Sequence, residues 1–227
     1  MSGRSEGSMS FLDHLEELRK TLFLALGGLA VGVIACYSVS LRIQEFLLQP
    51  IIRHPGTTLA LLAPTEGFIV RLKISLVAGL FVAAPWVFFQ LWHFVAPGLY
   101  DRERKMVLPV VFFSTLCFIA GAVFGYLILP WATKFFLSFA TPTVENVWSL
   151  GRYLDFVLRM FLAFGVVFEL PIVIYFLARL GIVTPDFLRR YRRHAYIVVL
   201  VAAAIITPPD VFTQVILAAP MVVLYEG

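Results

Sequence analysis

The feature that most constrains this fold is a series of long apolar runs separated by short polar or charged segments. A helix rises about 1.5 Å per residue, so about 20 apolar residues cross the hydrocarbon core of a bilayer. Backbone groups in lipid must bond within the spanning structure, which favours helices. We therefore expect an all-α polytopic membrane protein with six transmembrane helices. They form a single integral domain, residues 1–227, with spans at about 21–39, 74–94, 106–130, 156–180, 195–207 and 211–225.

Composition favours a membrane protein over a nucleic-acid-binding one. Hydrophobic residues make up 60% of the chain and charged residues 14%, whereas soluble domains carry about 25% charged residues. The net charge is +4, but the cations lie between the apolar runs, as in the loops of membrane proteins. The two cysteines, Cys36 and Cys117, lie inside apolar runs, and the histidines are scattered. We predict no disulfide, metal site or cofactor, and the polar segment before the first run argues against a cleaved leader.

The distribution of Lys and Arg predicts the orientation in the membrane. If the N-terminus is cytoplasmic, 11 cations lie on the inner side and 7 on the outer side. The cluster RRYRRH, residues 189–194, is the strongest single anchor. The excess of inner cations predicts a multi-pass protein of the cell's inner (cytoplasmic) membrane with both termini in the cytoplasm.

Prolines and glycines indicate how the helices bend and pack. Pro85, Pro171 and Pro220 lie near the middle of spans two, four and six, and each removes a backbone hydrogen bond. We infer a curved, concave bundle. The pairs Gly28/Gly32 and Gly121/Gly125 predict close helix packing within the chain. The last two spans are short for a bilayer and are joined by the turn TPPD, residues 207–210.

Two long segments between the spans are expected on the outer side, at residues 40–73 and 131–155. Each contains an amphipathic stretch, LRIQEFLLQP in the first and WATKFFLSF in the second. We expect both stretches to form short helices that lie over the outer face.

The N-terminal segment SFLDHLEELRKTL is predicted to form an amphipathic helix that lies on the inner membrane surface and then enters it. Asp13 and Glu17 are like charges four residues apart, a mildly unfavourable arrangement that a cationic partner would relieve. The helix alone favours the alternative of a solvated face with a Glu16–Lys20 pair. In the first inner loop, Glu103 lies among three cations, and by itself this suggests a neutralised loop.

Glu169 lies in the middle of the apolar run FGVVFELPIVIYF, residues 164–176. A charged acid at that depth costs about 2.5–3.5 kcal/mol on insertion scales, so it should face protein, water or a polar group of a partner. Thr207 and Gln214 in the last hairpin are candidate contacts within the chain. An internal hydrogen bond that only supports packing is the alternative to a functional role.

The sequence contains no GxSxG, HExxH or P-loop motif and no nucleophile–base pair at a reactive spacing. It therefore predicts a protein that is not an enzyme. Two rival functions remain to be weighed. One is a proton-coupled small-molecule transporter that uses Glu169 as its relay, and the other is an intramembrane hydrolase. The absence of a visible internal repeat argues against the first, and the absence of a nucleophile against the second.

Four segments together resemble the TatC family, the large integral subunit of the twin-arginine protein translocase. They are HLEELRK at 14–20, FVAPGLYDRER at 94–104, AFGVVFELPI at 163–172 and TPPDVFTQVILAAPM at 207–221. The resemblance spans nearly the whole chain in family order. It implies a receptor that binds paired-arginine signal peptides and moves folded proteins across the membrane with the proton motive force. Family members usually continue slightly beyond the sixth span, so we expect the natural protein to extend past Gly227.

The resemblance also implies residue roles. The positions expected to bind the signal peptide are Glu17, Arg19, Phe94 and Glu103. Two separate acids could select two adjacent arginines, because a guanidinium pairs bidentately with a carboxylate and lysine does not. The positions expected to contact the single-span partners, TatA and TatB, are Glu169, Thr207 and Gln214, in an oligomeric complex. Pro50 and Asp210 match family positions with structural roles.

Overall fold

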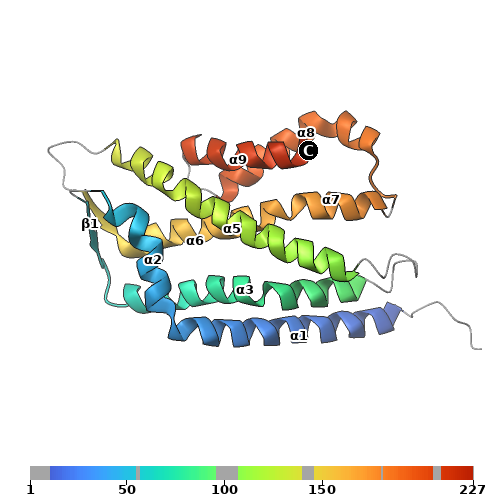
Figure 1. Ribbon diagram of the computed structural model, residues 1–227, viewed down its shortest axis with the longest axis horizontal. Helices are drawn as coiled ribbons and strands as arrows, with labels where there is room; N and C mark the ends of the chain where they lie inside the picture. Colours follow the sequence, from blue (N-terminus) through green and yellow to red (C-terminus); the bar gives the residue numbers. More distant parts are fainter. Residues whose placement is uncertain are drawn as a thin grey trace, which may run out of the picture.

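The computed structural model describes residues 11–54, 57–95, 107–139, 146–179, 181–206 and 211–226. Its helices are α1 (Phe11–Ser38), α2 (Ser40–Ile52), α3 (Glu66–Val95), α5 (Val107–Leu137), α6 (Leu150–Phe168), α7 (Leu170–Arg179), α8 (Pro185–Ile206) and α9 (Val211–Glu226). Two short strands, β1 (Thr57–Ala60) and β2 (Asn146–Ser149), pair in parallel. The long helices run side by side, with α1 and α3 along one edge and the α8–α9 hairpin along the other (Figure 1).

Four helical stretches are long and apolar enough to cross a membrane: His14–Ser38, Glu66–Val95, Val107–Leu137 and Leu150–Arg179. They correspond to the first four predicted spans, and each is longer than the predicted span. For example, α3 begins at Glu66 rather than at residue 74, because the first turns, which include the charged residues Arg71 and Lys73, are also helical. The predicted fifth and sixth spans appear as α8 and α9. Neither is among these four stretches, so a six-span arrangement stays a prediction.

The all-α prediction is confirmed for the bundle, and the two short strands lie together at one end of it, here called the sheet end (Figure 1). There, β1 and β2 pair Thr57 with Asn146 through Ala60 with Ser149, and so join the two long loops. The first amphipathic stretch forms α2, as predicted. The second prediction was wrong: WATKFFLSF begins as the last turns of α5, which continues through Pro130 to Leu137. The apolar side chains of α5 therefore continue through this stretch, and no separate short helix forms there.

Glycines set the closest helix contacts, as the GxxxG pairs predicted. A Cβ built on Gly121 would lie 2.3 Å from the Phe164 carbonyl oxygen, and one on Gly32 would lie 2.6 Å from the Gly79 carbonyl oxygen. Only glycine therefore allows α5 to approach α6, and α1 to approach α3, this closely. The main core lies where α3, α5 and α6 meet, and its fully buried members include Ile74, Leu129 and Phe164. Many other apolar side chains are exposed, as lipid-facing surfaces require.

Candidate functional site

The end of the bundle opposite the sheet, where α1 begins and α3 ends, is here called the N-terminal end (Figure 1). The ring of His14 on α1 stacks on the ring of Phe94 on α3, with centroids 4.6 Å apart and planes at 18°. Glu17 follows one helical turn after His14, so both side chains lie on the same side of α1. The stack thus fixes α1 against the last turn of α3 beside Glu17.

Glu17 is half-buried, and its Oε2 atom is buried without a hydrogen bond from any described residue. No ion pair to it occurs among the residues that the structure describes. A buried carboxylate oxygen without a donor is unfavourable, and it becomes favourable only when a donor or cation reaches it. The predicted Glu16–Lys20 pair is also absent from the described ion pairs, and Glu16 is exposed. Of these two neighbouring acids, only Glu17 is held against the protein.

The structure describes some of the other residues predicted for this end. Arg19 is exposed, and its guanidinium lies over the Phe23 ring at 5.7 Å from the centroid. Phe94 is half-buried in the last turn of α3. Glu103 lies outside the described residues, and so does the side chain of Asp13.

Glu169 occupies a break between two helices. It is the C-cap of α6, which ends at Phe168, and α7 begins at Leu170, so the helix is interrupted immediately before Pro171, where the sequence predicts a bend. The Glu169 carbonyl still accepts a hydrogen bond from the Val173 amide at 3.0 Å, which keeps the two helices nearly continuous. The side chain is half-buried, and its Oε1 atom is buried without a hydrogen bond within the part of the chain that the structure describes.

Two polar residues near this break were not singled out from the sequence. Ser114 of α5 is fully buried beside the Glu169 carboxyl group, and its hydroxyl is one of the buried groups without an assigned hydrogen bond among the described residues. Trp92 of α3 packs edge-on against Phe176 of α7 at 4.4 Å, with its buried Nε1 also unpaired. A serine and a tryptophan inside apolar runs give little sequence signal, because both residue types are common in transmembrane helices.

The last hairpin does not supply the contact to Glu169 that Gln214 was expected to offer. The Gln214 Nε2 group donates to the Leu200 carbonyl oxygen at 3.1 Å, which ties α9 to α8 instead. Thr207 and Asp210 lie outside the described residues. Pro50 is buried inside α2 at the sheet end. This position is compatible with the structural role expected for it.

At the sheet end, Glu66 was missed by the sequence analysis. Its Oε1 accepts hydrogen bonds from the Ser149 hydroxyl at 2.6 Å and from the Gly151 amide at 2.7 Å. Its Oε2 accepts from the amides of Leu62 and Ala63. Nearby, Lys73 and Asp155 form an ion pair at 2.7 Å between α3 and α6. Glu66 joins the two loop segments and the Lys73–Asp155 pair joins α3 to α6, so the role of both carboxylates is structural.

The long apolar helices define an integral membrane protein, and among its described residues two half-buried acids, Glu17 and Glu169, each have a carboxyl oxygen without a hydrogen bond. Within the described residues, no group of three or more His, Cys, Asp or Glu side chains could hold a metal ion.

The family model described as Sec-independent protein translocase protein (TatC) matches residues 13–220. TatC of Desulforapulum autotrophicum is 41% identical over 226 residues, which cover 98% of this chain and 84% of the relative. TatC of Magnetococcus marinus is 42% identical, covering 97% and 83%. A crystal structure of the twin arginine translocase receptor TatC in DDM matches with a TM-score of 0.85 and 38% identity, covering 94% of this chain and 96% of that chain.

This chain therefore belongs to the TatC family. As a family member it is a receptor subunit of the twin-arginine translocase, a transport protein and not an enzyme. Membership decides against both the intramembrane hydrolase and the proton-coupled small-molecule transporter.

Proposed function

We propose that the N-terminal end binds the paired-arginine segment of signal peptides through Glu17. The observation that carries this proposal is the buried Glu17 Oε2 atom, which has no donor among the described residues. An incoming guanidinium would supply two parallel donors and a positive charge, which is the geometry that best satisfies a carboxylate. Binding would therefore supply the hydrogen-bond donor that the buried Glu17 oxygen lacks in the free receptor.

Three further residues complete the proposed surface. Phe94 offers an aromatic wall beside Glu17, because its ring stacks on His14 one turn away. Arg19 is exposed and could donate to carbonyl oxygens of the peptide. Glu103 belongs to the segment that follows α3, and we propose it as the acid for the second arginine. Two acids on separate segments would favour two adjacent guanidinium groups over a single one.

The test is a titration of the purified full chain with a fluorescent twin-arginine signal peptide. Glu17→Ala should weaken binding by at least about tenfold, because a hydrogen bond to a charged group is lost. Glu16→Ala is the matched control, since Glu16 is a neighbouring acid that is exposed. Its affinity should stay near that of the unaltered chain. Equal affinities of the two variants, or equal binding of a twin-lysine peptide by the unaltered chain, would contradict the proposal.

We further propose that Glu169 receives a polar group from the single-span partners TatA and TatB. The support is a buried carboxyl oxygen without a hydrogen bond, beside the equally unpaired Ser114 hydroxyl. Gln214, whose amide nitrogen is bonded to Leu200, keeps its amide oxygen for a partner, and Thr207 is proposed to contribute beside it. A polar group in lipid gains most from partners of this kind, because water is absent there.

Copurification tests the second proposal. Glu169→Ala should reduce the recovered TatA and TatB by about tenfold, if one hydrogen bond to a charged group is lost. Glu45→Ala is the control, because Glu45 is an exposed acid on α2. Signal-peptide binding should persist in Glu169→Ala. Unchanged recovery of both partners would refute the role of Glu169 without affecting the role of Glu17.

We also propose an orientation of the chain in the membrane and an energy source for transport. The 11 cations on one side and 7 on the other support a cytoplasmic N-terminus and C-terminus in the inner membrane. The N-terminal end would then face the cytoplasm, where precursor proteins arrive. The missing P-loop motif agrees with transport that uses the proton motive force instead of ATP.

A further inference from the structure

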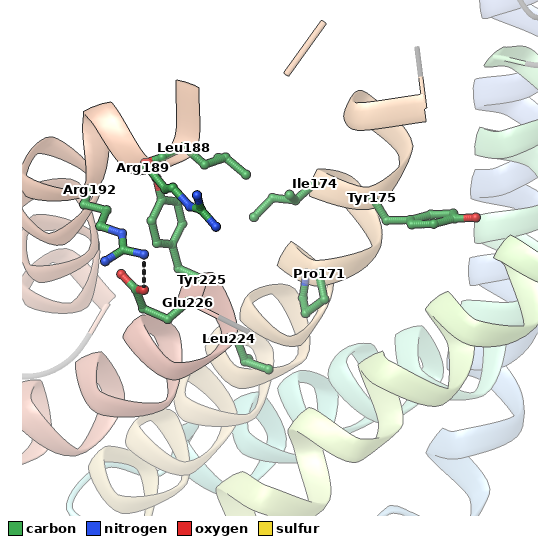
Figure 2. Close-up of a pocket in the computed structure, with 9 residues that line it drawn as sticks. All are labelled: Pro171, Ile174, Tyr175, Leu188, Arg189, Arg192, Leu224, Tyr225 and Glu226. Atoms are coloured by element: carbon green, nitrogen blue, oxygen red, sulfur yellow. Dashed lines mark hydrogen bonds and ion pairs between the residues drawn. The ribbon is translucent and has the colours of Figure 1, made fainter. Parts of the chain in front are cut away.

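A cavity of about 440 Å³ lies between α7, α8 and α9, outside the surfaces described above (Figure 2). Its size is within the range of about 300–1,000 Å³ that small-molecule pockets occupy. Its walls are of two kinds. One part is apolar, with Pro171 and Ile174 from α7, Leu188 from α8 and Leu224 from α9. The other part is the cationic rim formed by Arg189 and Arg192 of α8.

The two arginines of the rim differ in their partners. Arg192 is paired with Glu226 at 3.0 Å, and the second oxygen of Glu226 accepts a hydrogen bond from the Tyr196 hydroxyl. Each carboxylate oxygen of Glu226 thus already has a partner on α8. Arg189 has no hydrogen bond or ion pair among the described residues, and its guanidinium points into the cavity (Figure 2). The cavity therefore presents one uncompensated positive charge.

The position of the cavity along α8 suggests what fills it. The first turns of this helix carry RRYRRH, residues 189–194, and the remainder, from residue 195 to 206, is almost wholly apolar. Such a change from cationic to apolar residues marks the boundary between headgroups and hydrocarbon. An occupant at this depth meets positive charge on one side and an apolar wall on the other. A free anion would use only the cations and leave the apolar wall exposed.

We propose that this cavity binds one anionic phospholipid, with its phosphate on Arg189 and an acyl chain against Ile174 and Leu224. Basic pockets between transmembrane helices on the cytoplasmic side are suited to anionic headgroups. Arg192, already held by Glu226, lines the same rim and orients the headgroup. The lipid would also join α7 to the α8–α9 hairpin, because residues of all three helices line its cavity.

Native mass spectrometry of the full chain in detergent tests the site, with phosphatidylglycerol and phosphatidylcholine of identical acyl chains as probes. Arg189→Gln should weaken phosphatidylglycerol binding by at least about tenfold, since a charge-assisted hydrogen bond is lost together with the charge. Arg190→Gln is the matched control. The substitution removes the same charge from the same helix, but Arg190 does not line the cavity. The affinity for phosphatidylglycerol should therefore fall by less than about fivefold.

A second variant distinguishes a lipid from a free anion. Ile174→Trp should fill the apolar part and abolish phosphatidylglycerol binding, while Arg189 stays in place. Equal losses in Arg189→Gln and Arg190→Gln would overturn the site in favour of general surface attraction. Equal binding of phosphatidylcholine, or displacement of the lipid by millimolar glycerol phosphate, would overturn the choice of ligand. Arg189→Gln should keep the melting temperature of the lipid-free protein, because Arg189 has no partner within the described residues.

Discussion

At the sheet end, Glu66 accepts hydrogen bonds from four groups of its own chain, whereas at the N-terminal end Glu17 has a buried oxygen with no donor in the described structure. The neighbours of Glu66 follow the same pattern. Lys73 is paired with Asp155, and Arg71 donates to the Ser40 hydroxyl at 3.2 Å. Both acids belong to the first or second long helix, so their difference comes from what surrounds them.

This difference separates structural acids from acids available to partners. A carboxylate that is satisfied internally contributes to the stability of the free protein, and another molecule gains little by contacting it. A buried carboxylate without a donor does the opposite, because it leaves a desolvated polar atom for a partner to satisfy. Glu169 belongs to the second kind, although it lies at a helix break and not at an end of the bundle. Three substitutions test whether the distinction holds.

The largest effect is expected for Glu66→Ala. Four hydrogen bonds disappear, and the link from α3 to Ser149 and Gly151 is broken. We expect the melting temperature in detergent to fall by several degrees, while the affinity for a twin-arginine signal peptide stays within about twofold when measured well below that temperature. Glu45→Ala, at an exposed acid on the neighbouring α2, controls for the loss of one charge. An unchanged melting temperature would remove the contrast between the two ends.

A smaller effect of opposite sign is expected for Glu169→Leu. The substitution replaces a partly buried carboxyl that lacks a hydrogen bond by an apolar group of similar size. The free energy of unfolding should rise by about 1 kcal/mol in denaturant titrations of the isolated chain. Copurification of TatA and TatB should fall in the same variant. A loss of stability would instead show that Glu169 makes a hydrogen bond within the chain that supports packing, which is the alternative to a functional role.

The smallest effect is expected for Lys73→Ala. The Lys73 side chain is 46% exposed and that of Asp155 is 32% exposed, so solvent screens the pair. Its removal should lower the free energy of unfolding by less than about 1 kcal/mol, measured in the same titration. If this variant were as destabilising as Glu66→Ala, the ion pair would contribute as much to the stability of the sheet end as the Glu66 hydrogen bonds do.

Much of the bundle could be predicted from local sequence. The first four apolar runs are helices of spanning length, Pro171 marks a helix break, and the glycine pairs mark close contacts. Each of these follows from a property of the residue type itself: hydrophobicity, the missing amide hydrogen of proline, or the missing side chain of glycine. The second outer helix was predicted wrongly because the apolar run of α5 continues past Pro130 without a signal to stop. The parallel strands gave no usable pattern, since each has only four residues.

By itself, the sequence determined the membrane class, the approximate spans, the family and which acids were worth testing, because hydrophobicity, charge and motifs are local. Only the tertiary structure decided which acids are satisfied. Glu66 obtains its Ser149 partner from 83 residues away, and Glu17 is placed beside Phe94 by a ring stack between two helices. Glu226 of α9 pairs with Arg192, whereas Arg189 has no ion pair among the described residues. Hydrogen-bond satisfaction depends on distances of a few ångströms between distant segments, and folding sets those distances.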